Sequence, residues 1–372
     1  MASKRIAELQ SKIINPILIK KKENLFYLTG RSFNNHAEEF LLITKNNLVG
    51  FGGGLEKITW VKKVDRLKNI GKYLGNFKKL DIEYGFTYGE GEYIKYKIKA
   101  LGFKIEVRPE KSAVDIARQI KEPGEIALVK KSMQIVEKVF ELVKKEVKKS
   151  GMTEIKLAKF IESTGLKLGA EDVSFPAIVA SGANAAIPHH VPSAKQLKSG
   201  ESIIIDFGFK YQNYCSDFTR TVFLKTVPKR LVDAYNQVEK AYNQSMEFIN
   251  SPDPSLEKRG ATAVSSHLQK GRWGGVNGND VYQKAVEVLA EKKLDKYFIH
   301  SLGHGTGLEI HELPNLSPES KDVLENNMVF SIEPGVYIPK VGGIRIEDLV
   351  YLEQGKVKKF INVSTKLEDN IL

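Results

Sequence analysis

The sequence has few of the features that mark secreted, membrane-spanning or disulfide-linked proteins. Cys215 is the only cysteine among 372 residues, so no disulfide can form within the chain, and this usage is typical of a reducing compartment. No apolar run approaches the roughly 18 residues that a transmembrane helix needs. Residues 1–15 lack the apolar core and the cleavage site of a signal peptide and are typical of a short amphipathic helix. We therefore expect a cytoplasmic protein that does not bind membranes.

Positive charge is abundant, with 57 Lys and Arg against 45 Asp and Glu and a net charge of +12. A nucleic acid is one partner that such a charge would suit. The lysines, however, are spread along the chain and alternate with acids at helical spacing, and no zinc-finger, RRM or phosphate-binding glycine motif accompanies them. We interpret the charge as solvated helix faces and expect no dedicated nucleic-acid partner.

The order of apolar patterns predicts an α/β (α+β) protein with two domains. Residues 1–117 alternate between short strands and helices, which indicates a small α/β domain. Residues 118–372 begin with two amphipathic helices, the first preceded by Pro123, and continue with strands, two further helices and more strands. We expect these residues to form an antiparallel sheet flanked by helices. Residues 251–275 are rich in Ser, Gly, Pro and charge, and we interpret them as an exposed insertion.

Two acids interrupt the β-rich run IIIDFGFKYQNYCSDFTRTV at residues 203–222. If its strands form a hairpin with a turn centred on Tyr211 and Gln212, Asp206 lies directly opposite Asp217. Side chains opposite each other on antiparallel strands have Cβ atoms about 4.5–5.5 Å apart. Two carboxylates at that distance repel unless one takes up a proton or a cation lies nearby. The alternative is that one Asp is a turn residue and the other ends a strand.

Glu333 and Glu347 repeat this arrangement in the segments FSIEPGV and GIRIEDLV. A hairpin centred on Lys340 places the two glutamates opposite each other. Two surface glutamates near turns are the alternative, but the apolar neighbours of both argue against it. Buried carboxylates need partners, and a divalent metal ion can supply the positive charge.

The segment YFIHSLGHGTGLEIHE holds three of the chain's seven histidines within twelve residues: His300, His304 and His311. We expect the glycines at 303, 305 and 307 to let the backbone bend so that imidazoles converge. Four carboxylates and one imidazole suit two divalent cations about 3.5–4 Å apart, and a carboxylate-rich set favours Mn²⁺, with Co²⁺ or Zn²⁺ as alternatives. The predicted metal ligands are Asp206, Asp217, His304, Glu333 and Glu347.

The order and spacing of these five residues resemble those of the pita-bread metallopeptidases of the M24B type. The nearest members are Xaa-Pro dipeptidase (prolidase) and aminopeptidase P. The segments that carry the resemblance are SGANAAIPHHVPSAKQLKSGESIIIDFGFKYQNYCSDFTRTVFL, FIHSLGHGTGLEIHE and IEPGVYIPKVGGIRIEDLVYL. The resemblance covers most of residues 120–365, and the N-terminal segment with NLFYLTG resembles the smaller domain of the same proteins more loosely.

The resemblance implies a metallopeptidase that uses two metal ions to hydrolyse Xaa-Pro bonds in short proline-containing peptides. A dipeptidase is the first expectation and an aminopeptidase that acts on longer peptides the second. A non-catalytic binding protein of the same fold is a further alternative, although the complete ligand set argues against it. The resemblance also implies a homodimer.

The resemblance further implies catalytic roles for three residues. Glu333 would accept a proton from the attacking water and pass it to the leaving nitrogen. His189 would donate a hydrogen bond to the scissile amide or to the oxyanion, and His311 would face the tetrahedral intermediate.

Three more residues are expected to contact the substrate or to order the site. His300 would line the proline pocket. Arg345 lies two residues before Glu347, on the same strand face, and would orient an acid or bind a substrate carboxylate. Tyr337 would hold hydrogen bonds of the site. His190, adjacent to His189 in sequence, is expected to point the other way.

Overall fold

The computed structural model describes residues 2–33, 39–52, 55, 64–110, 112–251 and 275–372. The chain divides into two compact units, Met1–Arg118 and Gln119–Leu372. Most of the insertion expected at 251–275 lies outside the described residues. Among the described helices, none is both long and apolar enough to cross a membrane.

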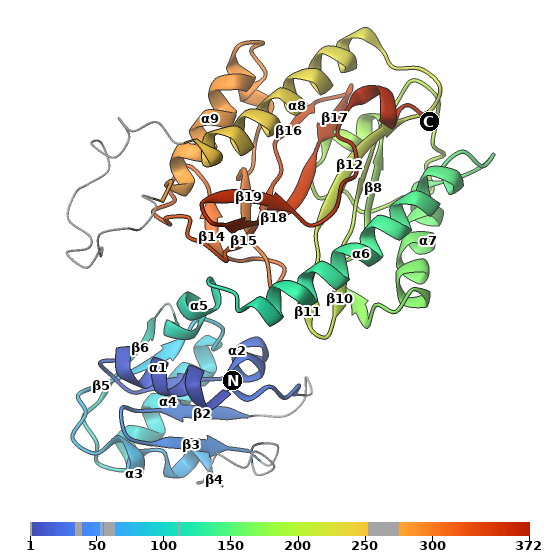
Figure 1. Ribbon diagram of the computed structural model, residues 1–372. Helices are drawn as coiled ribbons and strands as arrows, with labels where there is room; N and C mark the ends of the chain where they lie inside the picture. The colour runs from blue at the N-terminus through green and yellow to red at the C-terminus, as the bar shows by residue number, and fades with distance from the viewer. Residues whose placement is uncertain (1, 34–38, 53–54, 56–63, 111, 252–274) are drawn as a thin grey trace. The chain divides into compact units, whose positions relative to one another are not determined.

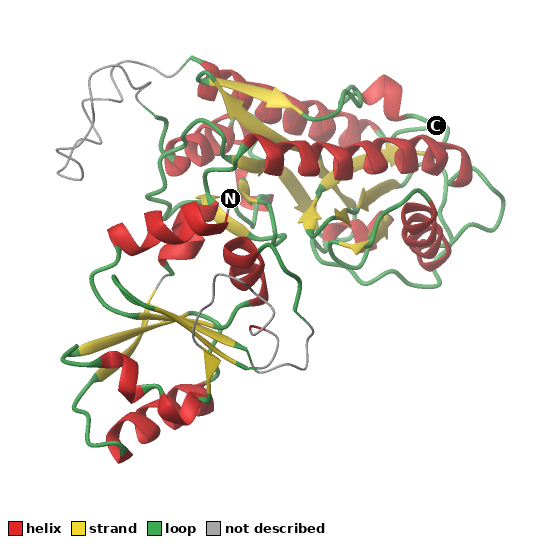
Figure 2. Ribbon diagram, turned by 60° about the horizontal axis from the view of Figure 1, so that its bottom comes forward, coloured by secondary structure: helices red, strands yellow, loops and turns green. Residues whose placement is uncertain are grey.

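The first unit is built on a six-stranded mixed sheet with helices on both faces (Figure 2). Its strands in spatial order are β4 Val64–Asp65, β3 Leu48–Phe51, β2 Phe40–Ile43, β1 Ile17–Ile19, β5 Lys79–Glu83 and β6 Glu106–Glu110. Its helices are α1 Ala2–Lys12, α2 Lys22–Thr29, α3 Gly71–Leu74, α4 Tyr88–Ala100 and α5 Ala113–Arg118. Strand β1 is central and wholly buried, which explains its continuous apolar sequence.

The second unit is built on an eight-stranded sheet in which every described pairing is antiparallel. Seven strands follow in the order β14 Glu312–Leu316, β13 Gly303–Gly305, β15 Val329–Ile332, β18 Glu347–Glu353, β12 Phe218–Phe223, β9 Ser202–Asp206 and β8 Ile178–Ser181, and β19 Lys356–Lys359 pairs with β18. Smaller sheets contain β7 Asp172–Val173, β10 Phe209–Tyr211 and β11 Tyr214–Cys215, and the ribbon of β16 Gly335–Ile338 and β17 Gly342–Arg345.

Helices cover this sheet on two sides (Figure 1). They are α6 Pro123–Glu146, α7 Glu154–Lys167, α8 Lys229–Asn250 and α9 Gly278–Ala290. Helices α8 and α9 pack against each other and bury Tyr235, Val238 and Val288 in one apolar core with strand residues such as Phe330. The mixed α/β fold with an antiparallel sheet between helices confirms the predicted fold class.

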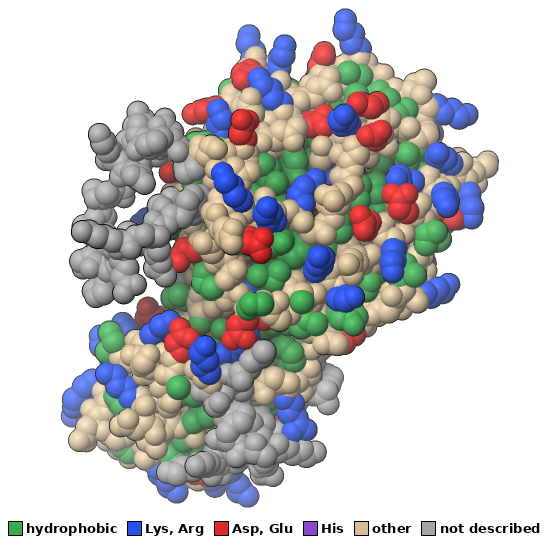
Figure 3. All heavy atoms as spheres, in the orientation of Figure 1, with side chains coloured by type: hydrophobic (Ala, Val, Ile, Leu, Met, Phe, Trp, Pro, Cys, Tyr) green, Lys and Arg blue, Asp and Glu red, His purple; other side chains and the backbone are tan. Residues whose placement is uncertain are grey.

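The charged surface is mixed in sign. On the face shown in Figure 3, Lys and Arg side chains lie among Asp and Glu side chains. On that face the net positive charge is therefore distributed, in keeping with the interpretation of solvated helix faces.

The hairpin that carries Asp206 and Asp217 has a different register from the predicted one. Asp206 pairs with Thr219 on the neighbouring strand, and Tyr211 pairs with Tyr214. The turn therefore consists of Gln212 and Asn213, whose φ angles of 47° and 69° match the left-handed turn that suits hairpin twist. The predicted pairing of Asp206 with Asp217 is wrong by two residues. Because side chains alternate with a period of two, this shift leaves both carboxylates on one face.

The second hairpin has the predicted register. Gly335 pairs with Arg345 in the ribbon, and Ile332 pairs with Asp348 in the main sheet. Glu333 and Glu347 lie between these two pairs, where the strands pass from one sheet into the other. The hairpin centred on Lys340 is thus confirmed.

Candidate active site

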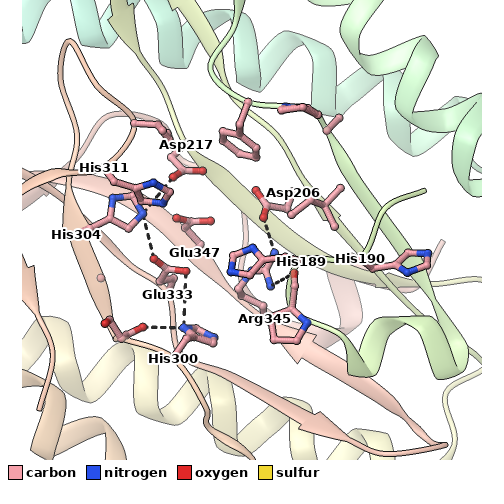
Figure 4. A pocket seen from close by; sticks show the side chains of 18 of the residues that line it. His189, His190, Asp206, Asp217, His300, His304, His311, Glu333, Arg345 and Glu347 are labelled. Atoms are coloured by element: carbon pink, nitrogen blue, oxygen red, sulfur yellow. Dashed lines mark hydrogen bonds and ion pairs between the residues drawn. The ribbon is translucent and has the colours of Figure 1, made fainter. Parts of the chain in front are cut away.

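One pocket of the second unit collects nine of the ten residues predicted for the site (Figure 4). Strand ends supply most of them, because the backbone leaves the ladder there and the side chains project beyond it. The nine are Asp206 at the end of β9, Asp217 before β12, His300 before β13, His304 in β13, His311 before β14, Glu333 after β15, Arg345 at the end of β17, Glu347 at the start of β18, and His189 between β8 and β9. Tyr337 lies behind this wall.

A compact group of ligand atoms lies at the centre of the pocket. Asp217, His304 and Glu347 each present one oxygen or nitrogen, and these three atoms lie within 4.8 Å of one another. The Nε2 atom of His304 is 3.5 Å from Asp217 Oδ2 and 3.3 Å from Glu333 Oε1. The carboxylates of Asp206, Asp217 and Glu347 are buried.

The buried carboxylates of this group repel one another. Burial, together with the charges of Glu347, Asp206 and Glu333, raises the pKa of Asp217 well above its usual range. Burial and the same kind of repulsion raise the pKa of Glu347, and burial raises that of Asp206 against the opposing charge of Arg345. Within the described residues, Asp206 Oδ1 and Glu347 Oε1 are buried without a hydrogen-bond partner. Such a donor set lacks positive charge, and divalent cations fit it.

Other oxygens of these acids have partners that fix their orientation. Thr219 Oγ1 donates to Glu347 Oε2 at 2.5 Å, Ser331 Oγ donates to Glu333 Oε1 at 3.1 Å, and Arg345 donates to Asp206 Oδ2. The sequence reasoning missed Thr219 and Ser331. Only their positions in the sequence could have identified them: each lies two residues from an acid and therefore on the same strand face as that acid.

A fully buried arginine fixes the strands behind the carboxylates. Arg220 donates to the carbonyl oxygens of Thr219 and Glu347 at 2.9 and 2.7 Å, and to Asp348 Oδ1 at 2.8 Å. The other oxygen of Asp348 accepts from Tyr242 OH at 2.5 Å. These bonds tie β12 to β18 at the point where Glu347 enters the pocket. The sequence could have indicated this role of Arg220, because a charged residue inside the β-rich run FTRTVF is unusual.

Glu333 and His304 form the polar contact at the centre of the pocket. Burial raises the pKa of Glu333, but the hydrogen bond and charge of His304 outweigh it and lower that pKa to about 2. Conversely, burial lowers the pKa of His304, and Glu333 more than restores it. The rings of His304 and His311 meet edge to face, with centroids 4.3 Å apart. Burial lowers the pKa of His311, as does the neighbouring His304.

A hydrogen-bonded chain defines the tautomer of His300. Its Nδ1 is 2.7 Å from the carbonyl oxygen of Ser301, so Nδ1 carries the proton and donates. Its Nε2 therefore accepts from Tyr337 OH at 2.9 Å, while that hydroxyl accepts from Arg345 at 2.7 Å. Burial lowers the pKa of His300, which favours this neutral form. Arg345 thus links Asp206 to Tyr337 and His300.

The two adjacent histidines 189 and 190 differ in direction. His189 projects toward the acids, whereas His190 turns away from them and its Nε2 lies 2.9 Å from Glu154 Oε2 (Figure 4). The sequence argument anticipated opposite directions but assumed a strand, and the structure has an irregular loop at this point.

The glycines around His304 have a different structural role from the predicted one. Gly303, Gly305 and Gly307 do not have positive φ angles, so they do not provide a bend that only glycine allows. A Cβ atom on Gly303 would lie 2.0 Å from the carbonyl oxygen of Ser331, and one on Gly305 would lie 2.1 Å from that of Leu313. Gly303 and Gly305 are required because neighbouring strands approach β13 closely on both sides, whereas a Cβ atom on Gly307 would meet the side chain of Glu312.

Comparison with known proteins gives consistent matches over nearly the whole chain. The sequence model of metallopeptidase family M24 matches residues 127–354. A Xaa-Pro dipeptidase of Pyrococcus horikoshii is 32% identical over 375 residues, which cover 98% of this chain and 97% of the relative. A putative Xaa-Pro aminopeptidase of Mycoplasma pneumoniae is 34% identical over 358 residues, 94% of this chain and 92% of the relative. The solved Xaa-Pro dipeptidase of Bacillus anthracis superposes with a TM-score of 0.83 at 28% identity, covering 99% of each chain.

We predict that Gly303→Ala destabilises the second unit by about 1–3 kcal/mol, because the strand must move away from Ser331. Chemical denaturation with a fluorescence readout measures this change. Gly89→Ala is the matched control, because no atom lies within 4 Å of the position that its Cβ would take and its φ is not left-handed. We expect the control to be neutral or slightly stabilising. Unchanged stability of Gly303→Ala would show that the strands have room for a methyl group.

Proposed function

We propose that this chain, which belongs to metallopeptidase family M24, hydrolyses the peptide bond before proline in short peptides. Its main substrates would be dipeptides. Family membership confirms the resemblance found in the sequence. The observation that carries the proposal is the convergence of four carboxylates and His304 in one pocket, with buried oxygens that lack partners among the described residues. The names of the relatives support the choice of Xaa-Pro bonds.

The donor set supports two divalent cations, in line with the expectation from the sequence. Asp217, His304 and Glu333 would hold one ion, and Asp206 and Glu347 the other. Oxygen donors predominate, which favours Mn²⁺ over softer metals. When bound, such ions supply Lewis acidity and lower the pKa of water toward neutrality. Manganese, the homodimer and the cytoplasmic location remain predictions of ours.

Glu333 is suited to move the proton. As an ionised carboxylate, it would accept a proton from the attacking water. The same carboxyl group then donates that proton to the proline nitrogen as the bond breaks. Ser331 holds one of its oxygens at 3.1 Å and so restricts its orientation during both transfers.

The histidines that surround the acids would contact the substrate. His189 and His311 project into the pocket, where each would donate a hydrogen bond to the carbonyl oxygen as its negative charge develops. His300, which burial keeps neutral and which Ser301 and Tyr337 orient, would line the proline subsite. Arg345 is already bound to Asp206 and Tyr337, which supports the orienting role over the carboxylate-binding one.

Part of the pocket lining is apolar. The apolar lining consists of Phe175, Pro176, Ala177, Ile178, Pro188, Val191, Pro192 and Ile310. Such a wall suits a proline ring or an apolar side chain. The scissile amide of an Xaa-Pro bond has no N–H and its ring fixes φ, so a site shaped for this amide needs no acceptor for an amide proton.

The substrate test compares three peptides with the Mn²⁺-loaded protein. We expect Ala-Pro to be hydrolysed faster than Ala-Pro-Ala and Ala-Ala to be cleaved at least about tenfold more slowly than Ala-Pro, because only proline supplies the tertiary amide. Chromatographic quantification of released alanine gives the rates. A faster reaction with Ala-Pro-Ala would support the aminopeptidase alternative, and absence of turnover with all three peptides would support a binding protein.

We expect Asp217→Ala and His304→Ala to lose bound metal and activity together, since each removes one atom of the central group. Elemental analysis after gel filtration measures the metal, and circular dichroism checks that the fold persists. Asp280→Ala is the control, because this acid lies in the first turn of α9 and does not line the pocket. Full metal content in either pocket variant would contradict the ligand assignment.

His189→Ala should keep its metal, because His189 is outside the proposed ligand set. Its hydrogen bond would strengthen in the transition state, so we expect kcat to fall by about 10²–10³. KM should change much less, since such a bond contributes little to ground-state binding. Steady-state kinetics with Ala-Pro separates the two parameters. Near-normal kcat in the metal-loaded variant would indicate that the histidine merely packs in its loop.

A further inference from the structure

Another buried carboxylate outside the group of four is hydrogen-bonded to His190, a residue that lines the pocket. Glu154 is the first residue of α7, and its side chain is fully buried. Its Oε1 accepts from the backbone N–H and the hydroxyl of Ser181, both at 2.8 Å, and from Asn184 Nδ2 at 3.1 Å. Its Oε2 accepts from the N–H and the hydroxyl of Ser193 at 3.1 and 2.6 Å, and from His190 Nε2 at 2.9 Å.

This carboxylate is fully satisfied, unlike the acids at the centre of the pocket. Burial raises the pKa of Glu154, but the hydrogen bonds from Ser193, His190, Ser181 and Asn184 outweigh it and lower the pKa to about 2. The N-terminal end of α7 adds a favourable dipole. A charged acceptor of this kind makes stronger hydrogen bonds than a neutral one. Glu154 is therefore suited to hold other groups in place, and not to bind a cation.

The groups that Glu154 holds come from the two ends of one loop. Ser181 ends β8 and Asn184 follows it, whereas His190 and Ser193 lie near the far end of the loop before β9. Between these anchors the chain has no strand pairing: residues Gly182–Ala186 form a short 3-10 helix, and beyond it the local backbone bonds are those of Ile187 to Asn184 and of His190 to Ile187. The anchored segment includes His189, whose side chain projects into the pocket. The position of that imidazole therefore depends on how firmly the loop is held at its two ends.

We propose that Glu154 is a positioning residue for the reaction: by holding both ends of loop 182–195, it sets where His189 lies in the pocket. This inference rests on the proposed function. The bond to His190 contributes by turning that ring away from the acids and leaving His189 to face them. Glu154 touches no group of the pocket centre itself, so its effect on turnover must pass through the loop.

The experiment is a double-mutant cycle with Glu154→Gln and His189→Ala. An amide at residue 154 turns one acceptor into a donor that faces Ser181 or Ser193, so the loop loses an anchor. We expect Glu154→Gln to lower kcat by at least about tenfold and by no more than the roughly 10²–10³ expected for complete loss of the His189 donor, with KM and metal content little changed. In the His189→Ala background the same change should cost less than roughly twofold, because the two residues act through one interaction. If the kcat of the double variant falls by the product of the two single-variant losses, the residues act independently and the proposal is overturned.

Two further variants complete the cycle. Ser193→Ala removes one donor to Glu154 without burying a new polar group, so it tests the anchor if Glu154→Gln folds poorly. It should give a smaller fall in kcat that also disappears in the His189→Ala background, and independent effects would contradict the inference. Glu239→Gln is the matched control: this partly buried glutamate on α8 accepts from Thr365 at 2.9 Å and does not line the pocket. We expect wild-type kinetics for it.

Hydrogen exchange tests the positioning without any turnover. Backbone amides of loop 182–195 should exchange at least about tenfold faster in Glu154→Gln than in the wild-type protein, while amides of α8 keep their rates. Unchanged exchange in the loop would overturn the inference. If the wild-type protein cleaves no Xaa-Pro peptide, the proposed function fails, and the exchange rates still decide whether Glu154 holds the loop.

Discussion

The structure of the second unit is organised around the mutual repulsion of four carboxylates, three of them buried and the fourth only slightly exposed. Asp206, Asp217, Glu333 and Glu347 face one pocket, and burial removes the water that would screen them. Such an arrangement is stable only if strong backbone constraints hold the acids and a positive charge offsets them. His304 and Arg345 supply part of that charge within the chain, and the remainder is what divalent cations would add.

The need to hold these repelling acids in place explains why they come from strand ends of one antiparallel sheet. A ladder of backbone hydrogen bonds is rigid, and a strand that slid by one residue to relieve the repulsion would reverse which of its side chains face the core. Arg220 and Asp348 add a buried ion pair directly behind Glu347, with four carbonyl groups accepting from the same guanidinium. A buried pair with so many partners contributes more to fixing one arrangement than to net stability.

The placement of the four acids in one pocket could largely be predicted from the sequence, because it follows from the alternation of side chains along strands. The hairpin of Asp206 and Asp217 was misplaced by two residues, since the turn at Gln212 and Asn213 contains no glycine to mark it. The prediction that both acids lie on one face of the sheet was still correct, because the register error was an even number of residues. The contacts of Glu154 could not be predicted: a glutamate at a helix start has an ordinary local explanation, and its partners lie 27 to 39 residues away.

The acids and the histidines near them are positioned in different ways, and the difference follows from the backbone. Residues on strands are fixed by ladders, whereas His189 and His311 lie outside strands and need other anchors. His311 directly precedes β14, whose first residue, Glu312, forms an ion pair with the buried Lys121 at 2.8 Å. The loop of His189 has Glu154. In both cases a charged contact with little solvent exposure lies next to the irregular segment, where the dry interior strengthens electrostatic interactions.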